Sequence, residues 1–310
     1  MSKSTSGIRL ELPYRLCDVF TTTRFQGNQL AVFEDAGELS SAEMQALANE
    51  TNLSETTFIL RRDRQTELRE GIRVRIFTTQ EELPFAGHPT LGTAATIRSF
   101  FPEHAGAEKI VLDLNVGKVP VRFLPDRNNH GPAYGVMTQR KPVFGAFHDP
   151  VDIARAIGMA IDDLAPTIAP QTVSTGLPYC VIVVRSIDVL ERLQIPQRDA
   201  TEYLARTDAR FFYCIAAVAG EPAVWRARMQ FYNGEDPATG SAAGCAISYL
   251  VERGLAGSGQ QVHLIQGVEI GRRSDLYVSA KQTNLGIDEV EVGGSTVPVA
   301  KGYVFRKRFT

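Results

Sequence analysis

Residues 229–250 read MQFYNGEDPATGSAAGCAISYL, and this stretch decides the fold. It opens with strand-like residues, passes through an acidic turn stiffened by Pro237, and continues as a run of small side chains from Gly240. A helix of such small residues can be enclosed by sheet on all sides. Gly254 is a favoured C-terminal cap, so the pattern predicts a buried central helix over residues 240–253.

An earlier segment has the same plan. Residues 75–97 read RIFTTQEELPFAGHPTLGTAATI, again a strand, an acidic loop, a glycine turn and a small-residue run. When Gly92 is aligned with Gly244, Leu91 matches Ala243 and Ala94 matches Ala246. Pro89 is favoured in the first turn of a helix, which predicts a second central helix over 89–101. The repeat is weak as sequence but indicates two similar domains.

Strand patterns dominate the rest of the chain. Ser40 and Glu43 have the spacing of a capping box before a short helix. Two further helices are predicted at 149–158 and 199–206. Predicted strands lie within 14–33 (two), at 53–60, 72–78, 109–124 (a hairpin), 132–138, 179–185, 211–218, 223–232, 261–266, 276–281, 287–292 and 302–308.

These elements do not alternate as strand–helix–strand, and GxGxxG is absent, which argues against a doubly wound nucleotide-binding fold. We therefore predict an α+β protein of two pseudo-symmetric domains, 1–128 and 129–290, each a mostly antiparallel sheet around a central helix. The boundary falls in the polar stretch 126–132. The segment 291–310 is a terminal strand that can return to the first domain.

Composition excludes several function classes. The 310 residues include 33 basic and 35 acidic side chains, a balance that disfavours nucleic-acid binding. No stretch approaches the ~18 apolar residues of a membrane span, and the N-terminus lacks the apolar core of a signal peptide. The 4 cysteines and 5 histidines show no metal-ligand spacing, so no metal is expected. We expect a cytoplasmic protein.

Two helix starts are candidate anion sites. In GEDPATGSAAG (234–244), the amides of residues 239–242 and the Ser241 hydroxyl suit a carboxylate. In LPFAGHPTLGTA (83–94), the helix start disfavours a charged His88, so a neutral imidazole that donates a hydrogen bond is plausible there. Each segment also has a purely structural interpretation. The first can be a capped buried helix with Asp236 as a loop acid, and in the second His88 can be a histidine packed in a loop.

Glu55, in NLSETTF (52–58), is a candidate acid/base. It stands where a helix gives way to a strand and precedes apolar residues, so desolvation would raise its pKa toward values useful for proton transfer. A solvated surface glutamate is the competing interpretation, and the segment alone does not decide between them.

Six ordered motifs together resemble the PhzF-like family of phenazine biosynthesis, whose members have the diaminopimelate-epimerase-like fold. The resemblance covers residues 14–305. The motifs are DVFTTTRFQGNQLAVF (18–33), NLSETTF (52–58), PFAGHPTLGTA (84–94), VSTGLPY (173–179), GEDPATGSAAG (234–244) and IQGVEIGRRSDL (265–276).

The resemblance implies cofactor-independent isomerisation by proton transfer, as on trans-2,3-dihydro-3-hydroxyanthranilate, in a cleft between the domains. It implies that Glu55 is the acid/base and that His88 and Asp236 position the substrate and relay protons. It further implies a small anionic carboxylate substrate and a homodimer. The residues expected to bind the substrate are Gly87, Thr175, Gly176, Thr239, Gly240 and Ser241.

The sequence departs from related patterns at several points. The related epimerases and proline racemases carry a cysteine at each helix start, but here these positions hold Gly87-His88 and Gly240-Ser241, and Cys245 lies inside the helix. The Gly27-Asn28-Gln29 turn has glutamine where the family usually has proline. The later glycine turn has Arg272-Arg273, where proline is typical of the second position. The alternatives that stay open are an amino-acid racemase or epimerase and a non-catalytic carboxylate-binding protein.

Overall fold

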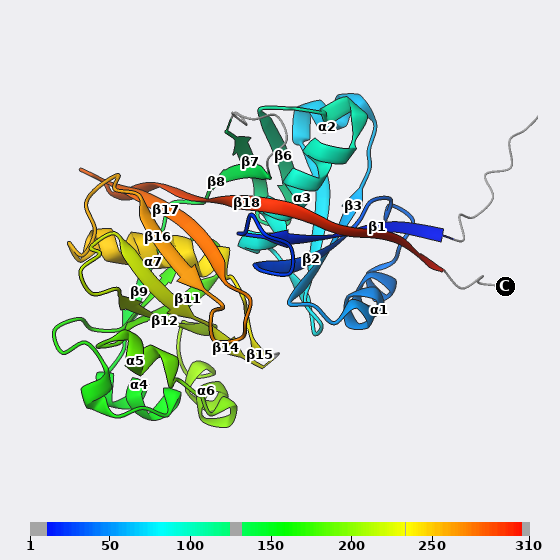
Figure 1. Ribbon diagram of the computed structural model, residues 1–310. Helices are drawn as coiled ribbons and strands as arrows, with labels where there is room; N and C mark the ends of the chain where they lie inside the picture. The colour runs from blue at the N-terminus through cyan, green and yellow to red at the C-terminus, as the bar shows by residue number, and fades with distance from the viewer. Residues whose placement is uncertain (1–10, 125–131, 233, 306–310) are drawn as a thin grey trace, which may run out of the picture.

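The computed structural model describes residues 11–124, 132–232 and 234–305 (Figure 1). The predicted boundary within 126–132 therefore lies outside the described residues except for Pro132. The fold is mixed α+β, as the sequence predicted, but most strands belong to one large sheet rather than to a separate sheet for each half. The strands are β1 (Glu11–Val19), β2 (Asn28–Phe33), β3 (Glu55–Leu60), β4 (Ile72–Phe77), β5 (Glu82–Leu83), β6 (Lys109–Leu114), β7 (Gly117–Phe123), β8 (Ala133–Thr138), β9 (Val143–Phe147), β10 (Gln171–Ser174), β11 (Pro178–Val183), β12 (Phe211–Ala217), β13 (Val224–Arg228), β14 (Gln230–Phe231), β15 (Gly234–Glu235), β16 (Val262–Gln266), β17 (Ser274–Thr283) and β18 (Gly286–Phe305).

The helices are α1 (Ser41–Thr51), α2 (Arg64–Glu70), α3 (Gly87–Phe100), α4 (Pro150–Ile157), α5 (Ile187–Glu191), α6 (Gln197–Leu204) and α7 (Gly240–Glu252). The capping box is confirmed, because Ser40 accepts from the Glu43 amide and Glu43 accepts from the Ser40 amide. α3 begins at Gly87, two residues earlier than predicted. Pro89 tolerates a place in the first turn because amides there have no partner within the helix.

The long strand β18 organises the sheet and crosses the molecule from one half to the other (Figure 1). Sequence patterns predicted separate strands at 287–292 and 302–308, which is wrong within the described range: one strand runs from Gly286 to Phe305. β18 pairs first with β17, then with β8, and finally with β1. Glycines and alternating apolar residues allow this strand to continue through both environments.

One set of strands, β1, β2, β3, β4, β6, β7, β8 and β18, closes on itself because β1 pairs with both β2 and β18. α3 packs against most of these strands. Beyond β18 the sheet continues as β17, β16, β13, β12, β11, β10 and β9, and α7 packs against β10, β11, β17 and β18. Each small-residue helix is thus covered by sheet, as its composition predicted.

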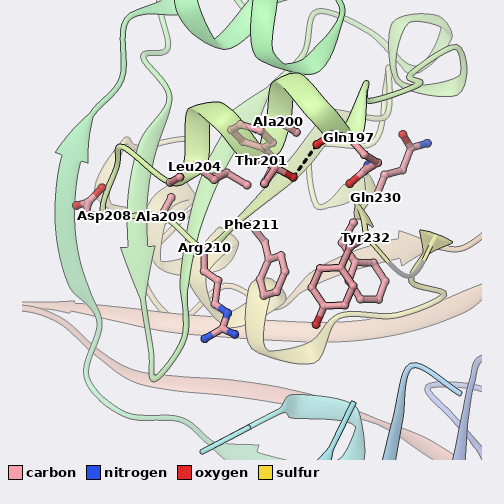
Figure 2. Close-up of a pocket in the computed structure, with 13 residues that line it drawn as sticks. Gln197, Ala200, Thr201, Leu204, Asp208, Ala209, Arg210, Phe211, Gln230 and Tyr232 are labelled. Carbon is pink, nitrogen blue, oxygen red and sulfur yellow. Dashed lines mark hydrogen bonds between the residues drawn. The ribbon is translucent and has the colours of Figure 1, made fainter. Parts of the chain in front are cut away.

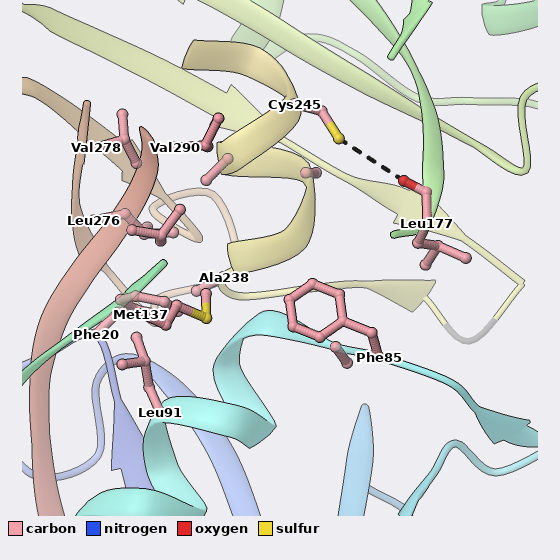
Figure 3. Packing of buried hydrophobic residues seen from close by; sticks show 14 of the residues in the cluster. Phe20, Phe85, Leu91, Met137, Leu177, Ala238, Cys245, Leu276, Val278 and Val290 are labelled. Carbon is pink, nitrogen blue, oxygen red and sulfur yellow. Dashed lines mark hydrogen bonds between the residues drawn. The ribbon is translucent and has the colours of Figure 1, made fainter. Parts of the chain in front are cut away.

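The main hydrophobic core lies around both central helices (Figure 3). Phe20 and Leu91 from the N-terminal half and Leu276 from the C-terminal half belong to this one cluster. Full burial of a side chain such as Phe or Leu stabilises a fold by about 1.5–3 kcal/mol. The shared core therefore fixes the N-terminal ends of α3 and α7 relative to each other.

Candidate active site

The N-terminal ends of α3 and α7 are in backbone contact. A Cβ atom on Gly87 would lie 2.4 Å from the carbonyl carbon of Gly240 and 2.4 Å from the amide nitrogen of Ser241. The N-cap residues, Ala86 and Thr239, make no side-chain cap to either helix. Both helix N-termini, each the positive end of a helix dipole, thus meet at one place, which favours an anion there.

Glu55 lies beside this junction, at the start of β3. Its side chain is 14% exposed, and its Oε2 lies 3.4 Å from Nδ1 of His88. Oε2 is buried and has no hydrogen-bond partner among the described residues. Burial, followed by the negative charge of Asp236, raises the pKa of the Glu55 carboxyl well above its ordinary value. Oε2 is therefore desolvated and has no hydrogen-bond donor in the part of the chain that the structure describes.

His88 occupies the first turn of α3 and is 2% exposed. Burial lowers the pKa of its imidazole to about 3, so the ring is neutral at ordinary pH. Its Nδ1 lies 3.1 Å from the side-chain nitrogen of Asn28, while Nε2 is buried without a partner in the described structure. A neutral imidazole retains one N–H donor and one acceptor for a ligand.

Asp236 follows the β14–β15 hairpin and is 4% exposed. Its Oδ1 accepts from Asn28 at 2.7 Å, and its Oδ2 accepts from the Thr239 hydroxyl at 2.6 Å. Burial raises the pKa of this carboxyl to about 6, although those two hydrogen bonds oppose the rise. Asp236 and Glu55 are therefore two interacting carboxyls, of which Asp236 is the better hydrogen-bonded.

The predicted binding residues gather at the start of α7. The Ser241 hydroxyl lies 2.7 Å from the Tyr179 hydroxyl, and both are buried. The Thr239 amide donates to Oε1 of Gln266 at 3.1 Å. Gly240 contacts Gly87, as described above.

Thr175 and Gly176 lie on the neighbouring loop between β10 and β11. The Thr175 hydroxyl donates to Oε1 of Gln139 at 2.6 Å, and Nε2 of Gln139 donates to the Gly240 carbonyl at 2.8 Å. Gly176 has φ +143, and a Cβ there would lie 3.2 Å from the Phe85 ring. The hydroxyl of Thr175 is therefore committed within the protein, and its part is to support the start of α7.

Sequence reasoning missed four buried polar residues that hold these groups: Asn28, Gln139, Tyr179 and Gln266. Asn28 and Gln266 stand inside motifs quoted for the resemblance, so a polar residue at the edge of an apolar strand was the available signal. Gln139 follows a strand without any motif. Its role depends on a contact with α7 that only the tertiary structure creates.

The cysteines are not placed for acid/base work. Cys245 is buried in α7, with its Sγ 3.7 Å from the Thr175 hydroxyl and 3.8 Å from the Leu177 carbonyl (Figure 3). Burial raises the pKa of this thiol to about 12, which keeps it protonated. Within the described residues, no group of three or more His, Cys, Asp or Glu side chains could hold a metal ion. No helix in that part of the chain could cross a membrane.

A cavity of about 400 Å³ lies between α6 and the aromatic residues Phe211, Phe231 and Tyr232 (Figure 2). Phe211 also contacts Tyr179, with ring centroids 5.8 Å apart, so the cavity wall continues to the partner of Ser241. Arg210, on the same wall, forms an ion pair with Glu81 of the N-terminal half. An aromatic wall therefore connects this cavity to the start of α7.

Comparison with known proteins identifies similar chains. Residues 17–302 match the sequence model of a family described as phenazine biosynthesis-like protein. A trans-2,3-dihydro-3-hydroxyanthranilate isomerase of Pseudomonas aeruginosa is 32% identical over 295 residues, which cover 94% of this chain and 99% of the relative. A solved Pseudomonas aeruginosa structure, described as a predicted epimerase, is 35% identical with a TM-score of 0.80, covering 96% of this chain and 100% of that chain. A Bacillus anthracis PhzF-family structure has a TM-score of 0.81 at 23% identity, covering 96% and 99%, which shows the shared fold.

Proposed function

The chain belongs to the phenazine biosynthesis-like protein family, and on that premise we propose that it is an isomerase in which Glu55 moves a proton between two carbon atoms of a small carboxylate-bearing metabolite. Several of its relatives, among them those of Pseudomonas aeruginosa and Mesorhizobium japonicum, are named isomerases. We propose a substrate similar to trans-2,3-dihydro-3-hydroxyanthranilate. The observation that carries the proposal is the buried, unpaired Oε2 of Glu55, 3.4 Å from a neutral imidazole and beside two helix N-termini.

The substrate carboxylate binds at the first turn of α7, where the amides of Gly240 and Ser241 and the Ser241 hydroxyl provide donors. Gly87 and Gly240 have no Cβ atoms, so the two helix starts approach closely enough to share one anion. Thr239, Thr175 and Gly176 shape the surrounding wall. These amide and hydroxyl donors favour a small anionic metabolite as the ligand.

The ionised Glu55 carboxylate removes a proton from carbon. The C–H bond breaks and the proton bonds to Glu55, while the electron pair of that bond forms a new double bond to the neighbouring carbon and the π pair of the original double bond moves to that bond's far carbon. The protonated carboxyl then delivers the proton to this far carbon. The raised pKa of Glu55 makes the carboxylate a stronger base than an exposed glutamate. The isomerisation involves no net oxidation or reduction of the substrate, so we propose a reaction without a cofactor.

His88 stabilises the negative charge that develops during this transfer, and His88 and Asp236 position the substrate and relay protons. A neutral His88 keeps an N–H donor, and preorganised donors in a buried site act most strongly where charge appears. Loss of one such donor raises a reaction barrier by about 2.7–4 kcal/mol in other enzymes. Both residues touch the substrate in this proposal.

We also propose the finer architecture: two pseudo-symmetric domains, 1–128 and 129–290, with the site in a cleft between them. Apart from β18, which contacts both helices, α3 and α7 pack against different strands, and this supports the division. A homodimer is proposed from the family resemblance. Light scattering after size-exclusion chromatography should give twice the 34.0 kDa of one chain, and a mass of one chain would refute the dimer.

The function is tested by incubating the protein with trans-2,3-dihydro-3-hydroxyanthranilate and following its double bonds by NMR. We expect isomerisation by the wild type and none by Glu55→Gln. Proline and 4-hydroxyproline serve as racemase substrates in parallel, and optical rotation reports their inversion. Inversion without isomerisation would support a racemase, whereas tight binding without either reaction would support a carboxylate-binding protein.

A further inference from the structure

Two segments that depart from the family pattern lie against each other, although about 245 residues separate them. The amide of Gly27 donates to the Arg273 carbonyl at 2.9 Å, and the amide of Arg273 donates to the side chain of Gln26 at 2.8 Å. The turn before β2 is therefore attached to the loop between β16 and β17. No role in the proton transfer has been assigned above to Gln26, Gly27, Arg272 or Arg273.

The Arg272 guanidinium holds the turn through its carbonyls. Its Nε donates to the Gly27 carbonyl at 2.8 Å, and its Nη2 donates to the Gln26 carbonyl at 3.0 Å. Nη2 also donates to Oδ1 of Asp18 at 2.6 Å, and the other oxygen of Asp18 accepts from the Phe25 amide at 2.6 Å. The Asp18 side chain is 2% exposed, so Arg272 is its buried counter-charge.

The turn has little freedom to move by itself. Gly27 has φ +72, and a Cβ there would lie 2.4 Å from the Val19 carbonyl. A planar guanidinium can donate to two carbonyls and a carboxylate at once because its N–H groups form a rigid fork, whereas a lysine ammonium lacks that geometry. The carbonyls of residues 26 and 27 thus have a partner that only arginine provides.

Asn28 follows directly and reaches the proposed catalytic groups. Its side-chain nitrogen donates to Asp236 at 2.7 Å and to the Ala238 carbonyl at 2.8 Å, and it lies 3.1 Å from Nδ1 of His88. Asn28 is 1% exposed. The two N–H groups of this amide are thus donated to Asp236 and Ala238, and the same nitrogen contacts the His88 ring, so the position of Asp236 beside His88 depends on Asn28 and, through it, on the turn.

We infer that Arg272 is a positioning residue for the proton transfer: it holds the 26–27 carbonyls so that Asn28 keeps Asp236 and His88 in place. The inference rests on the proposed function of these two groups. Without the guanidinium, the turn loses two hydrogen bonds and the buried carboxylate of Asp18 loses its counter-charge. The amide of Asn28 then no longer stays in place between Asp236 and His88.

The test compares Arg272→Lys, Arg272→Ala and Arg273→Ala in the isomerase assay. We expect both Arg272 variants to lose about 10- to 100-fold in kcat, the size expected from losing hydrogen bonds that involve charged groups, with KM little changed. Guanidinium ion added at millimolar concentration should restore part of the kcat of Arg272→Ala but not of Arg272→Lys. Arg273→Ala is the matched control, because Arg273 binds the turn through its backbone and its side chain is 52% exposed. It should behave like the wild type.

Asn28→Ala tests the other end of the same connection. It should show the kcat loss of Arg272→Ala without rescue by guanidinium, and the double variant should lose no more than Asn28→Ala alone. Independent, multiplicative losses, or a rise in KM with unchanged kcat, would overturn the inference. Thermal unfolding of each variant establishes that it is folded.

A second measurement does not depend on turnover. The ¹⁵N resonances of the His88 ring should shift in Arg272→Ala and stay unchanged in Arg273→Ala. A wild type without activity would remove the proposed function, but these resonances would still test the connection. Unchanged His88 resonances in folded Arg272→Ala would overturn it.

Discussion

Gly87 and Gly240, which begin the two central helices, touch through their backbones, and a Cβ atom on Gly87 would lie 2.4 Å from the carbonyl carbon of Gly240. The contact joins the helix starts of the two halves and places their first-turn amides beside Glu55 and His88. Backbone atoms cannot move aside as a flexible side chain can. The geometry of the proposed anion site therefore requires that residue 87 has no side chain.

Gly87→Ala tests this contact. The added methyl group must separate the helix starts, and overpacking of this kind costs about 1–3 kcal/mol of stability. We expect a lower free energy of unfolding in urea and a higher KM for the carboxylate substrate. The control is Gly37→Ala, whose Cβ would have no atom within 4 Å. Unchanged KM in Gly87→Ala would show that the amides of the two helices do not act together.

Glu55→Gln should stabilise the protein while abolishing its activity. The pKa of Glu55 is raised in the folded state, so wild-type stability falls as pH rises from the unfolded pKa through that raised value. A glutamine at this position does not titrate, so its stability does not fall with pH, and an unpaired buried charge costs more than the roughly 1–3 kcal/mol of a neutral polar group. The variant should therefore unfold at a higher temperature than the wild type at pH 8 and with little difference at pH 4. Equal melting temperatures at pH 8 would contradict an unpaired buried charge.

The pH profile should report the interaction between the two carboxyls. Because Glu55 must be ionised to accept a proton, kcat/KM should rise with pH through its elevated pKa. The negative charge of Asp236 contributes to that elevation. In Asp236→Asn the charge is removed, so the pKa of Glu55 falls and the rising part of the residual activity should move to lower pH. A shift to higher pH would contradict the assignment of Glu55 as the base.

Cys245→Ala should remain active. The thiol is buried, and its pKa of about 12 keeps it protonated, so it cannot serve as a base near neutral pH. A modest loss of thermal stability is expected from the cavity in α7, with kcat within about threefold of the wild type. Loss of isomerisation in a folded Cys245→Ala would return a thiol mechanism to consideration.

The sequence predicted the parts of this structure that local physics determines. The capping box at Ser40, the two small-residue helices and the hairpin at 109–124 depend on neighbouring residues, and all four are present. The predicted site residues lie around the place where the N-terminal ends of α3 and α7 meet, but the motifs alone did not show what holds them. Glu55 in particular could not be distinguished from a surface acid, because its burial depends on contacts with distant segments.

What the sequence did not predict depends on long-range pairing. The continuity of β18 requires β1, β8 and β17 to lie on its sides in succession, which no local pattern encodes. The roles of Asn28 and Gln139 arise from contacts with residues more than 100 positions away. The departure at Arg272-Arg273 was visible in the sequence, but its meaning emerged only when the loop was found against the turn at Gly27.

Deuterium transfer tests the central claim most directly. The protein is incubated with trans-2,3-dihydro-3-hydroxyanthranilate in heavy water, and NMR follows deuterium at the carbons on both ends of the shifted double bond. With the wild type, we predict isomerisation with deuterium entering the carbon that receives the proton, to the extent that Glu55 exchanges with solvent. With Glu55→Gln, we predict neither isomerisation nor deuterium at either carbon. Isomerisation at the wild-type rate by folded Glu55→Gln would contradict the account.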